Sequence, residues 1–435
     1  MLDAGLEAVG APGLISRHLR REGDAVSIGD CPYDVASGRV LVLGAGKASA
    51  ALAAAVETAL EGLPLGGIVL TRRGYAVPTR WIEVREGGHP IPDEGGMVGA
   101  KAILDVADTV TGDDLVLCLF SGGGSALLSV PPPGIPLRAL QRLTEALLRC
   151  GATIEEINTV RRHLSVVQGG RLAARIGHAR VVTLLLSAVP GDAPEAIASG
   201  PTVPDPTTFA DAREVLVRHG IWPDIAEEIR VHLDAGVRGA VRETPKPGDP
   251  IFERTRTLFL GNVWTAVGAA LAAGEARGFD CRELRVSILG EAREVGARLA
   301  RTGMALRDCV PTPTLLVGGG ETTVTVTGEG RGGRNQELAL AAAIALDGST
   351  GVTVASLATD GTDGPTDAAG GIVDGGTADR ARAAGLDPRK ALATNDALPL
   401  LRAAGDLLVT GPTGTNVADI VAVLVSPGEG DSERR

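Results

Sequence analysis

Short runs of β-branched residues and leucine alternate along the chain with longer segments rich in alanine, leucine and glutamate. The short runs predict buried strands, and the longer segments predict helices. We expect strands at residues 39–43, 67–71, 114–120, 181–187, 257–260, 314–317, 352–357 and 407–409. We expect helices at residues 48–60, 96–108, 168–176, 266–276, 295–306 and 335–345, and an N-terminal amphipathic helix interrupted near Pro12. This alternation predicts an α/β fold with mostly parallel sheets covered by helices on both faces.

The length of the chain predicts two domains, because 435 residues exceed one ordinary hydrophobic core. The pattern is interrupted at residues 243–250 by three prolines and a glycine, which cannot continue a helix or a central strand. We therefore expect an N-terminal Rossmann-like α/β lobe at residues 1–242 and a C-terminal α/β lobe at residues 251–435. The first helix could pack on either lobe.

The composition excludes several classes of protein. A formal charge of -11 argues against nucleic acid as a partner, since phosphate backbones require clustered lysine and arginine. The five cysteines form no C-x-x-C pair, which excludes a disulfide framework and favours a reducing, cytoplasmic location. The longest uncharged stretch, residues 257–274, is broken by polar residues and glycines and does not resemble a membrane span. The N-terminus lacks the hydrophobic core of a signal peptide.

The turn after the first predicted strand is a candidate for anion binding. Gly44 and Gly46 allow a tight turn that brings N–H groups toward a phosphate at a helix N-terminus, and Lys47 adds a positive charge. Leu41 stands where a Walker A loop requires its first glycine, and Ser49 where a dinucleotide fingerprint has its third. A plain strand–helix turn is the alternative.

Two further strand ends in the N-terminal half carry candidate groups. The residues after the strand at 114–120 are Ser121, Gly122, Gly123, Gly124 and Ser125. Their amides predict a nest for phosphate oxygens, with a tight turn that binds nothing as the alternative. Asp192 follows the strand at 181–187 in a proline-rich loop, a usual place for a metal-binding or general-base carboxylate, although a turn or cap role is open.

The C-terminal half repeats this arrangement. The strand at 314–317 continues into Gly318, Gly319 and Gly320, which we expect to bind phosphate or carboxylate groups, and Glu321 after them is a further candidate contact for substrate or nucleotide. Arg334 opens a helix next to Asn335, where the helix dipole repels a cation, so a bound anion would resolve the conflict. Asp360 and Asp363 are candidate Mg²⁺ ligands, with Asx turns as the alternative. Thr413 and Asn416, in the loop after the last predicted strand, are candidate contacts for substrate or nucleotide.

Taken together, these loops resemble the glycerate 2-kinase family, whose C-terminal part is called the MOFRL domain. The matching strings include VLGAGKASAAL, GGHPIPDEGG, LFSGGGSALL, VPGDAPEAIASGPTVPDPTT, GRGGRNQELAL and ATDGTDGPTDAAG, and they extend over residues 40–420. The resemblance implies two α/β lobes with the active site in the cleft between them. It also implies transfer of the γ-phosphoryl group of ATP to the 2-hydroxyl of D-glycerate, with Mg²⁺ as cofactor.

The resemblance assigns roles residue by residue. It implies catalytic roles for Lys47, Asp192 and Arg334, the first and last as cations for the glycerate carboxylate and the transferring phosphoryl group. Asp192 would accept the hydroxyl proton or hold Mg²⁺. The family's GxN loop survives as Asn262 and its neighbours, a candidate nucleotide contact.

Three departures from the family's usual strings lie near these candidates: Ala188, Ala193 and Gln168. The first two replace aspartates and the third replaces a lysine, which removes two carboxylates and a cation.

Two other functions stay open. One is an NADPH-dependent hydroxypyruvate reductase, in which Arg72 or Arg73 would meet a 2′-phosphate. The other is a non-catalytic organic-acid-binding protein. We expect the partners to be small molecules, neither nucleic acid nor membrane, and a homodimer is left open.

Overall fold

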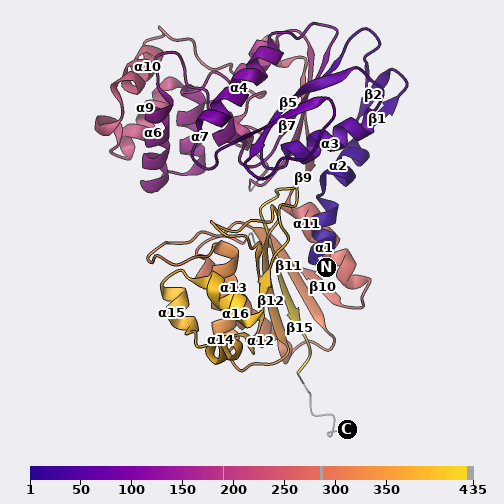
Figure 1. Ribbon diagram of the computed structural model, residues 1–435, viewed down its shortest axis with the longest axis vertical. Helices are drawn as coiled ribbons and strands as arrows, with labels where there is room; N and C mark the ends of the chain where they lie inside the picture. Colours follow the sequence, from indigo (N-terminus) through magenta and orange to yellow (C-terminus); the bar gives the residue numbers. More distant parts are fainter. Residues whose placement is uncertain (190, 285–287, 429–435) are drawn as a thin grey trace. The chain divides into compact units, whose positions relative to one another are not determined.

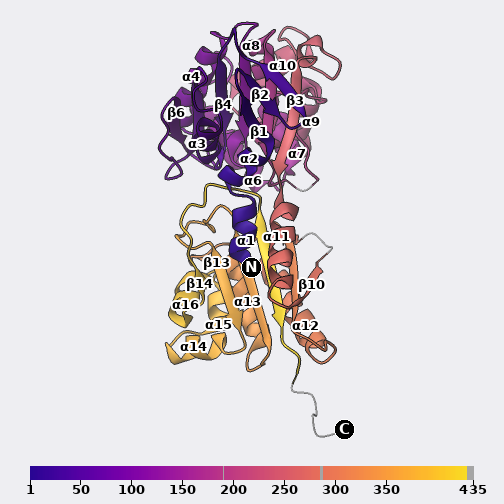
Figure 2. The same ribbon diagram turned by 90° about the vertical axis from the view of Figure 1, so that its right-hand side faces the viewer.

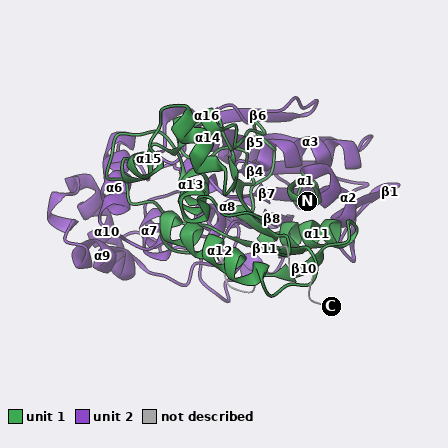
Figure 3. Ribbon diagram, turned by 90° about the horizontal axis from the view of Figure 1, so that it is seen from below, with its two compact units in different colours: residues 1–10, 261–435 green, residues 11–260 purple. Residues whose placement is uncertain are grey.

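The computed structural model of the protein describes residues 1–189, 191–284 and 288–428. The chain forms two compact units, one of residues 11–260 and the other of residues 1–10 together with 261–435 (Figure 3). Pro190, in the loop that precedes Asp192, lies outside the described residues.

The first unit is built on a six-stranded sheet in the order β6-β5-β4-β7-β8-β9 (Figure 1). The strands are β4 (Val40–Ala45), β5 (Leu65–Arg72), β6 (Ile82–Gly87), β7 (Leu115–Phe120), β8 (Arg180–Leu186) and β9 (Thr255–Gly261). The neighbouring pairs from β6 to β8 are parallel, which confirms the sequence prediction for this half of the chain. Ala45 pairs with Phe120, so the turns that follow β4 and β7 lie next to each other.

Helices cover both faces of this sheet. The helices are α3 (Ser49–Ala59), α4 (Glu94–Ala107), α5 (Gly124–Leu127) and α8 (Arg171–Ile176). On one face, Ile103 of α4 and Leu172 of α8 share a buried cluster with Leu43 and Val116 of the strands. Helix α3 packs against β4, β5 and β7 without joining that cluster, and α2 (Ala11–His18) packs on α3. A small antiparallel sheet follows, made of β1 (Leu19–Glu22), β2 (Ala25–Ile28) and β3 (Cys31–Asp34).

Four helices of the first unit form a second core beside the sheet (Figure 1). They are α6 (Leu137–Arg149), α7 (Ile154–His163), α9 (Phe209–Arg218) and α10 (Glu227–Val237). Their apolar faces bury Leu140, Val160, Phe209 and Leu233 against one another. This core fixes α7, whose last turn carries two adjacent arginines.

The second unit contains a mixed sheet in the order β10-β11-β15-β12-β13-β14. The strands are β10 (Asp280–Glu283), β11 (Thr314–Gly320), β12 (Val352–Ala358), β13 (Gly370–Asp374), β14 (Leu407–Leu408) and β15 (Asp419–Val425). Strands β10 and β11 are parallel, but the other neighbouring pairs are antiparallel. The prediction of a mostly parallel sheet is therefore wrong here, because the late strand β15 inserts between β11 and β12.

Helices cover this second sheet on both faces as well. Helices α12 (Ala292–Arg307) and α13 (Arg334–Leu346) bury Leu299 and Leu340 with Leu316 of β11. Because side chains alternate along a strand, Leu315 faces the other way, toward α11 (Val263–Glu275). Helix α1 (Leu2–Ala8) packs on α11 (Figure 2). Three short helices complete the unit: α14 (Thr377–Ala383), α15 (Pro388–Ala393) and α16 (Ala397–Ala404).

The division between the units falls after residue 260, later than the sequence-based limits of 242 and 251. The reason is that β9 completes the first sheet. The proline-rich segment is attached to the first unit, since Glu243 accepts a hydrogen bond from the Phe209 amide (2.8 Å) and Pro245 accepts one from the Asp205 amide (2.9 Å). Among the described residues, no helix is both long and apolar enough to span a bilayer.

Candidate active site

The turns after β4 and β7 are joined by hydrogen bonds. The Lys47 amide donates to the Gly122 carbonyl (3.0 Å), and the Ala48 amide donates to Ser121 Oγ (3.1 Å). Gly46 has a φ of +143°, and a Cβ there would overlap Ser121. Contact between the turns thus requires glycine at residue 46, and Ser121 holds the residue that precedes α3.

This arrangement uses the amides that were expected to hold a phosphate at the first turn. The Gly46 amide donates to the Leu70 carbonyl (3.1 Å), and the Ser49 amide donates to the Gly46 carbonyl (3.2 Å). The amides of Lys47 and Ala48 are used in the two hydrogen bonds between the turns. Gly44 is required because a Cβ would overlap the Leu119 carbonyl. The prediction that Gly44 and Gly46 cradle an anion is therefore wrong, and only the Lys47 side chain remains a candidate at this turn.

The turn after β7 has a different character. Among the described residues, no acceptor is paired with the amides of Gly122 and Gly123. Gly123 has a left-handed conformation (φ 89°, ψ -14°), in which consecutive amides form a concave anion-binding nest. A Cβ at Gly123 would lie 3.2 Å from His89 Cδ2 and 3.4 Å from Lys47 Cγ, so both side chains border the nest. A Cβ at Gly124 would lie 2.7 Å from Ala198 Cβ and 2.8 Å from the Ala45 carbonyl oxygen, so close packing requires this glycine.

The loop after β8 carries strained backbone next to this turn. Asp192, Ala198 and Ser199 have φ values of 52°, 52° and 59°, in the left-handed region that residues with a Cβ rarely adopt. Ser199 Oγ lies 2.9 Å from Ser125 Oγ, which ties the loop to the turn. Strain of this kind persists where the surroundings enforce it, often at functional sites. Asp192 itself is half-buried.

In the second unit, Arg334 is paired with two carboxylates of the protein. Asp419 accepts hydrogen bonds from Nε (2.6 Å) and Nη2 (2.9 Å), and Glu321 pairs with Nη1 (2.9 Å). These groups, and not a bound anion, resolve the conflict between Arg334 and the dipole of α13.

Asp363 has both carboxylate oxygens engaged by the same helix. It accepts hydrogen bonds from the amides of Asn335 (3.1 Å) and Gln336 (2.9 Å) and from both of their side chains. Burial raises the pKa of Asp363, and the hydrogen bonds from the two amides oppose that shift. This geometry contradicts the expected metal role of Asp363 and the expected nucleotide contact of Asn335, whose Oδ1 accepts from Ser356 Oγ (2.6 Å).

Two further expectations are corrected in the second unit. Gly318, Gly319 and Gly320 belong to β11 and pair with β15, so their backbone does not form a phosphate loop. They are glycines because a Cβ at Gly319 would overlap Val263 and one at Gly320 would overlap the Ile288 carbonyl. Asn262 caps α11, where its Oδ1 accepts from the Trp264 amide (3.0 Å).

The loops at the ends of β12 and β14 meet each other. Asp360 accepts a hydrogen bond from the Thr362 amide (2.9 Å), an Asx turn, and its carbonyl accepts from the Thr413 amide (3.4 Å). Thr413 Oγ1 donates to the Thr359 carbonyl. Asn416, three residues after Thr413, is buried. Asp360 remains a candidate ligand, whereas the side chain of Thr413 serves the loop.

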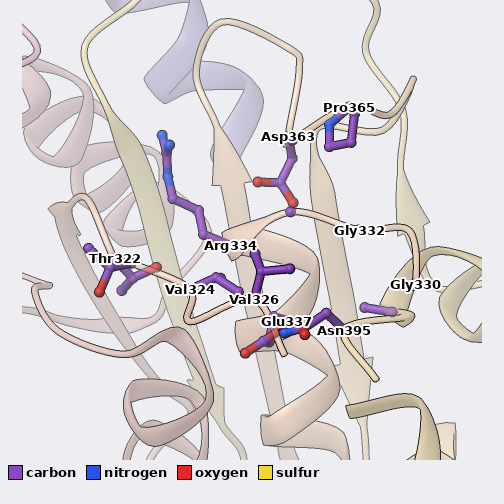
Figure 4. A pocket seen from close by; sticks show the side chains of 14 residues that line it. Thr322, Val324, Val326, Gly330, Gly332, Arg334, Glu337, Asp363, Pro365 and Asn395 are labelled. Carbon is purple, nitrogen blue, oxygen red and sulfur yellow. The ribbon is translucent and has the colours of Figure 1, made fainter. Parts of the chain in front are cut away.

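A cavity of about 500 Å³ lies within the second unit (Figure 4). Arg334 and Asp363 border it on one side and Glu337 and Asn395 on another, with the valines at 324 and 326 between them. A cavity of this size and mixed lining can hold a small molecule.

The described residues contain no cluster of three or more histidine, cysteine or acidic side chains arranged to hold a metal ion. Mg²⁺ often binds through one or two carboxylates together with phosphate oxygens and water. Asp192 and Asp360 fit that minimal pattern, and Asp363 does not, because its oxygens are engaged.

The chain is similar to known proteins over nearly its whole length. Residues 1–234 match the domain of unknown function DUF4147, and residues 314–419 match the MOFRL family. The D-glycerate 2-kinase of Thermotoga maritima is 44% identical over 391 residues, covering 89% of this chain and 91% of that protein. The chain belongs to the glycerate 2-kinase family. The crystal structure of glycerate kinase from the same organism has a TM-score of 0.82 at 40% identity and covers 98% of this chain and 97% of that one.

Another relative has a different name. A protein of Agrobacterium vitis, provisionally named a hydroxypyruvate reductase, is 46% identical over 393 residues, 89% of this chain and 87% of that protein. Names within the glycerate 2-kinase family thus differ among similar sequences.

Some residues of this family member were not found from its sequence. One is His89, which borders the nest. The other is Asp419, which orients Arg334. The sequence signal for Asp419 is an aspartate at the start of an apolar strand. Gln168, which stands where the family usually has lysine, donates from Nε2 to the Ser125 carbonyl (2.7 Å). This departure therefore supports the turn after β7.

Proposed function

We propose that the chain catalyses the transfer of the γ-phosphoryl group of ATP to the 2-hydroxyl of D-glycerate, giving 2-phosphoglycerate and ADP. The observation that carries this proposal is the nest at Gly122 and Gly123, whose amides have no acceptor in the described part of the chain and which Lys47 borders. Family membership supports the choice of substrate and reaction.

In the proposed reaction, the 2-hydroxyl oxygen attacks the γ-phosphorus and the bond to the β-phosphate oxygen breaks. The nest and Lys47 neutralise the negative charge on the transferring group, which such transition states require more than covalent chemistry. Asp192 either accepts the proton of the hydroxyl group or holds Mg²⁺. Mg²⁺ bound to the nucleotide phosphates, with Asp192 or Asp360 as ligand, would supply further neutralising charge.

Arg334 acts through one edge of its guanidinium in this proposal. Asp419 is buried and holds Nε and Nη2, whereas Glu321 is 45% exposed and pairs with Nη1. Exposed ion pairs are weak, so an anionic group of a substrate can displace Glu321 while Asp419 keeps Arg334 oriented. An active site between the two units, a cytoplasmic location and a homodimer stay predictions.

The test is ³¹P NMR of a reaction containing D-glycerate, ATP and Mg²⁺. We expect the γ-phosphate signal of ATP to disappear as a 2-phosphoglycerate signal grows, and no product without D-glycerate. If no phosphoester forms although calorimetry detects bound glycerate, a non-catalytic binding protein is the correct interpretation.

The name of the Agrobacterium vitis relative makes hydroxypyruvate reduction the second candidate. The structure does not favour it, because the amides of the turn after β4 are used within the protein. Arg72 lies over the Tyr75 ring (5.4 Å) and Arg73 pairs with Asp93, so both expected partners of a 2′-phosphate are engaged. Oxidation of NADPH on addition of hydroxypyruvate would establish this activity.

A further inference from the structure

Two adjacent arginines at the end of α7 have opposite electrostatic surroundings. Arg162 is buried and forms an ion pair with buried Asp205 (2.9 Å). Arg161 forms no ion pair with any carboxylate among the described residues, and the one hydrogen bond of its side chain there is a 3.4 Å contact from Nη1 to Asn158 Oδ1. The first arginine is thus part of the fold, and the second presents guanidinium N–H groups that the described structure does not use.

Burial of the Arg161 guanidinium without a carboxylate partner among the described residues is energetically unfavourable. Burial lowers the pKa of Arg161 to about 10, with no acidic group to offset the loss of hydration. The C-terminal end of α7 favours a cation by only about 0.3–1 kcal/mol. An uncompensated, half-buried guanidinium is a strong site for an anion, because bound carboxylate or phosphate restores the missing partner.

A chain of short contacts connects Arg161 with the nest after β7. Asn158 Oδ1 accepts from Arg161 and lies 3.0 Å from Ser199 Oγ, which lies 2.9 Å from Ser125 Oγ. The left-handed backbone at Ser199 places its hydroxyl group between the two. Strain in the loop after β8 therefore has a consequence: it holds Asn158 and the turn after β7 in a fixed relation.

We propose that Arg161 binds the carboxylate of glycerate, in an anion site that it forms with Asn158 beside the Gly122–Gly123 nest. This assignment rests on the proposed function for the identity of the substrate. It separates two tasks: Arg161 recognises the carboxylate, and the nest and Lys47 bind the transferring phosphoryl group. Arg161 is then the residue that distinguishes a hydroxy acid from an uncharged polyol.

The variants Arg161→Gln and Arg161→Lys test this assignment, with Arg142→Gln as the matched control. Arg142 is exposed on α6 and has no hydrogen bond or ion pair among the described residues. We expect Arg161→Gln to raise the KM for D-glycerate at least about tenfold while the KM for ATP changes less than about twofold. Arg161→Lys keeps the charge but loses the planar guanidinium, so its KM for D-glycerate should lie between those of the wild type and Arg161→Gln.

A substrate lacking the carboxylate gives a readout that a structural role does not affect. The wild type should prefer D-glycerate to its amide, and Arg161→Gln should lose most of that preference, with an unchanged melting temperature. Retained preference, or equal increases in the KM for glycerate and ATP, would overturn the assignment.

Direct binding separates this assignment from the proposed function. If the wild type phosphorylates no glycerate, calorimetry with D-glycerate, hydroxypyruvate and inorganic phosphate still tests the anion site. Binding of any of these probes that Arg161→Gln abolishes and Arg142→Gln preserves supports the site, although the kinase proposal has failed. No binding of any probe to the wild type overturns the site.

Discussion

The carboxylate of Asp419 accepts two hydrogen bonds from the guanidinium of Arg334, from Nε at 2.6 Å and from Nη2 at 2.9 Å. Burial alone would lower the pKa of Arg334, but the charges of Asp419 and Glu321 outweigh it and raise the pKa. Arg334 is therefore positively charged at neutral pH, and Asp419 orients it. Its function depends on a residue 85 positions away in the sequence.

The first prediction concerns this orientation. Asp419→Asn keeps the shape of the side chain but removes its charge and one acceptor. We expect kcat/KM for glycerate phosphorylation to fall about 10- to 100-fold, because Arg334 loses its fixed position. We also expect a loss of about 2 kcal/mol in the free energy of unfolding, measured by denaturant titration. Asp367→Asn, which removes an exposed partner of Arg402, is the control and should leave both quantities unchanged.

Lys47 is the second target. Lys47→Ala should lower kcat/KM at least about a hundredfold, equivalent to about 2.7 kcal/mol, because it removes the cation beside the Gly122–Gly123 nest. Steady-state kinetics with D-glycerate and ATP measure this, with a melting curve to confirm folding. Lys101→Ala, on the exposed face of α4, should retain normal rates. Near-normal kinetics in Lys47→Ala would exclude the proposed role.

Several parts of the structure could be predicted from sequence because they depend on local patterns. The buried runs that became β4, β7 and β12 bury all or nearly all of their side chains, and such runs have few alternatives. The prediction of an anion site at the turn after β7 also depends on local information. Three consecutive glycines at a strand end cost backbone entropy, which suggests that the turn requires a particular geometry.

Other parts could not be predicted because they depend on distant residues. Gly319 and Gly320 suggested a loop, yet they continue a strand because Val263 and Ile288 approach too closely for a side chain. Arg161 and Arg162 are equivalent in the sequence. Only the position of Asp205, more than 40 residues later, makes one structural and leaves the other without an acidic partner.

Gly46 provides a third prediction about the joined turns. Gly46→Ala would place a Cβ 2.7 Å from the Ser121 carbonyl oxygen, at a φ of +143°. We expect the free energy of unfolding to fall by about 1–3 kcal/mol. Activity should fall as well, because the turn that carries Lys47 must shift. Gly112→Ala is the control, since a Cβ there meets nothing within 4 Å. Equal stability of the two variants would contradict the geometry.

The variant Asp363→Ala tests whether Asp363 stabilises the fold or binds a metal ion. Asp363→Ala leaves the amide donors of Asn335 and Gln336 without their buried acceptor, so we expect a loss of at least about 2 kcal/mol in unfolding free energy. The Mg²⁺ concentration for half-maximal activity should stay within about twofold of the wild type, measured in a metal titration. Asp192→Asn should show the opposite, with normal stability and a raised Mg²⁺ requirement or a lower kcat. A raised requirement in Asp363→Ala without loss of stability would restore its metal role.

The last prediction concerns acid stability. Burial alone would raise the pKa of Glu243, but hydrogen bonds from His163, the Phe209 amide and Lys246 outweigh it and lower the pKa from 4.5 to about 2. A lowered pKa in the folded state stabilises the protein fully above pH 4.5, and this contribution is lost as the pH falls toward 2. Glu243→Gln should be less stable than the wild type at pH 7, and the difference should shrink between pH 4.5 and 2 in denaturant titrations. Glu214→Gln, at an exposed pair on α9, should follow the wild-type curve. If the Glu243→Gln and wild-type curves stay parallel through this range, Glu243 is not the group that titrates.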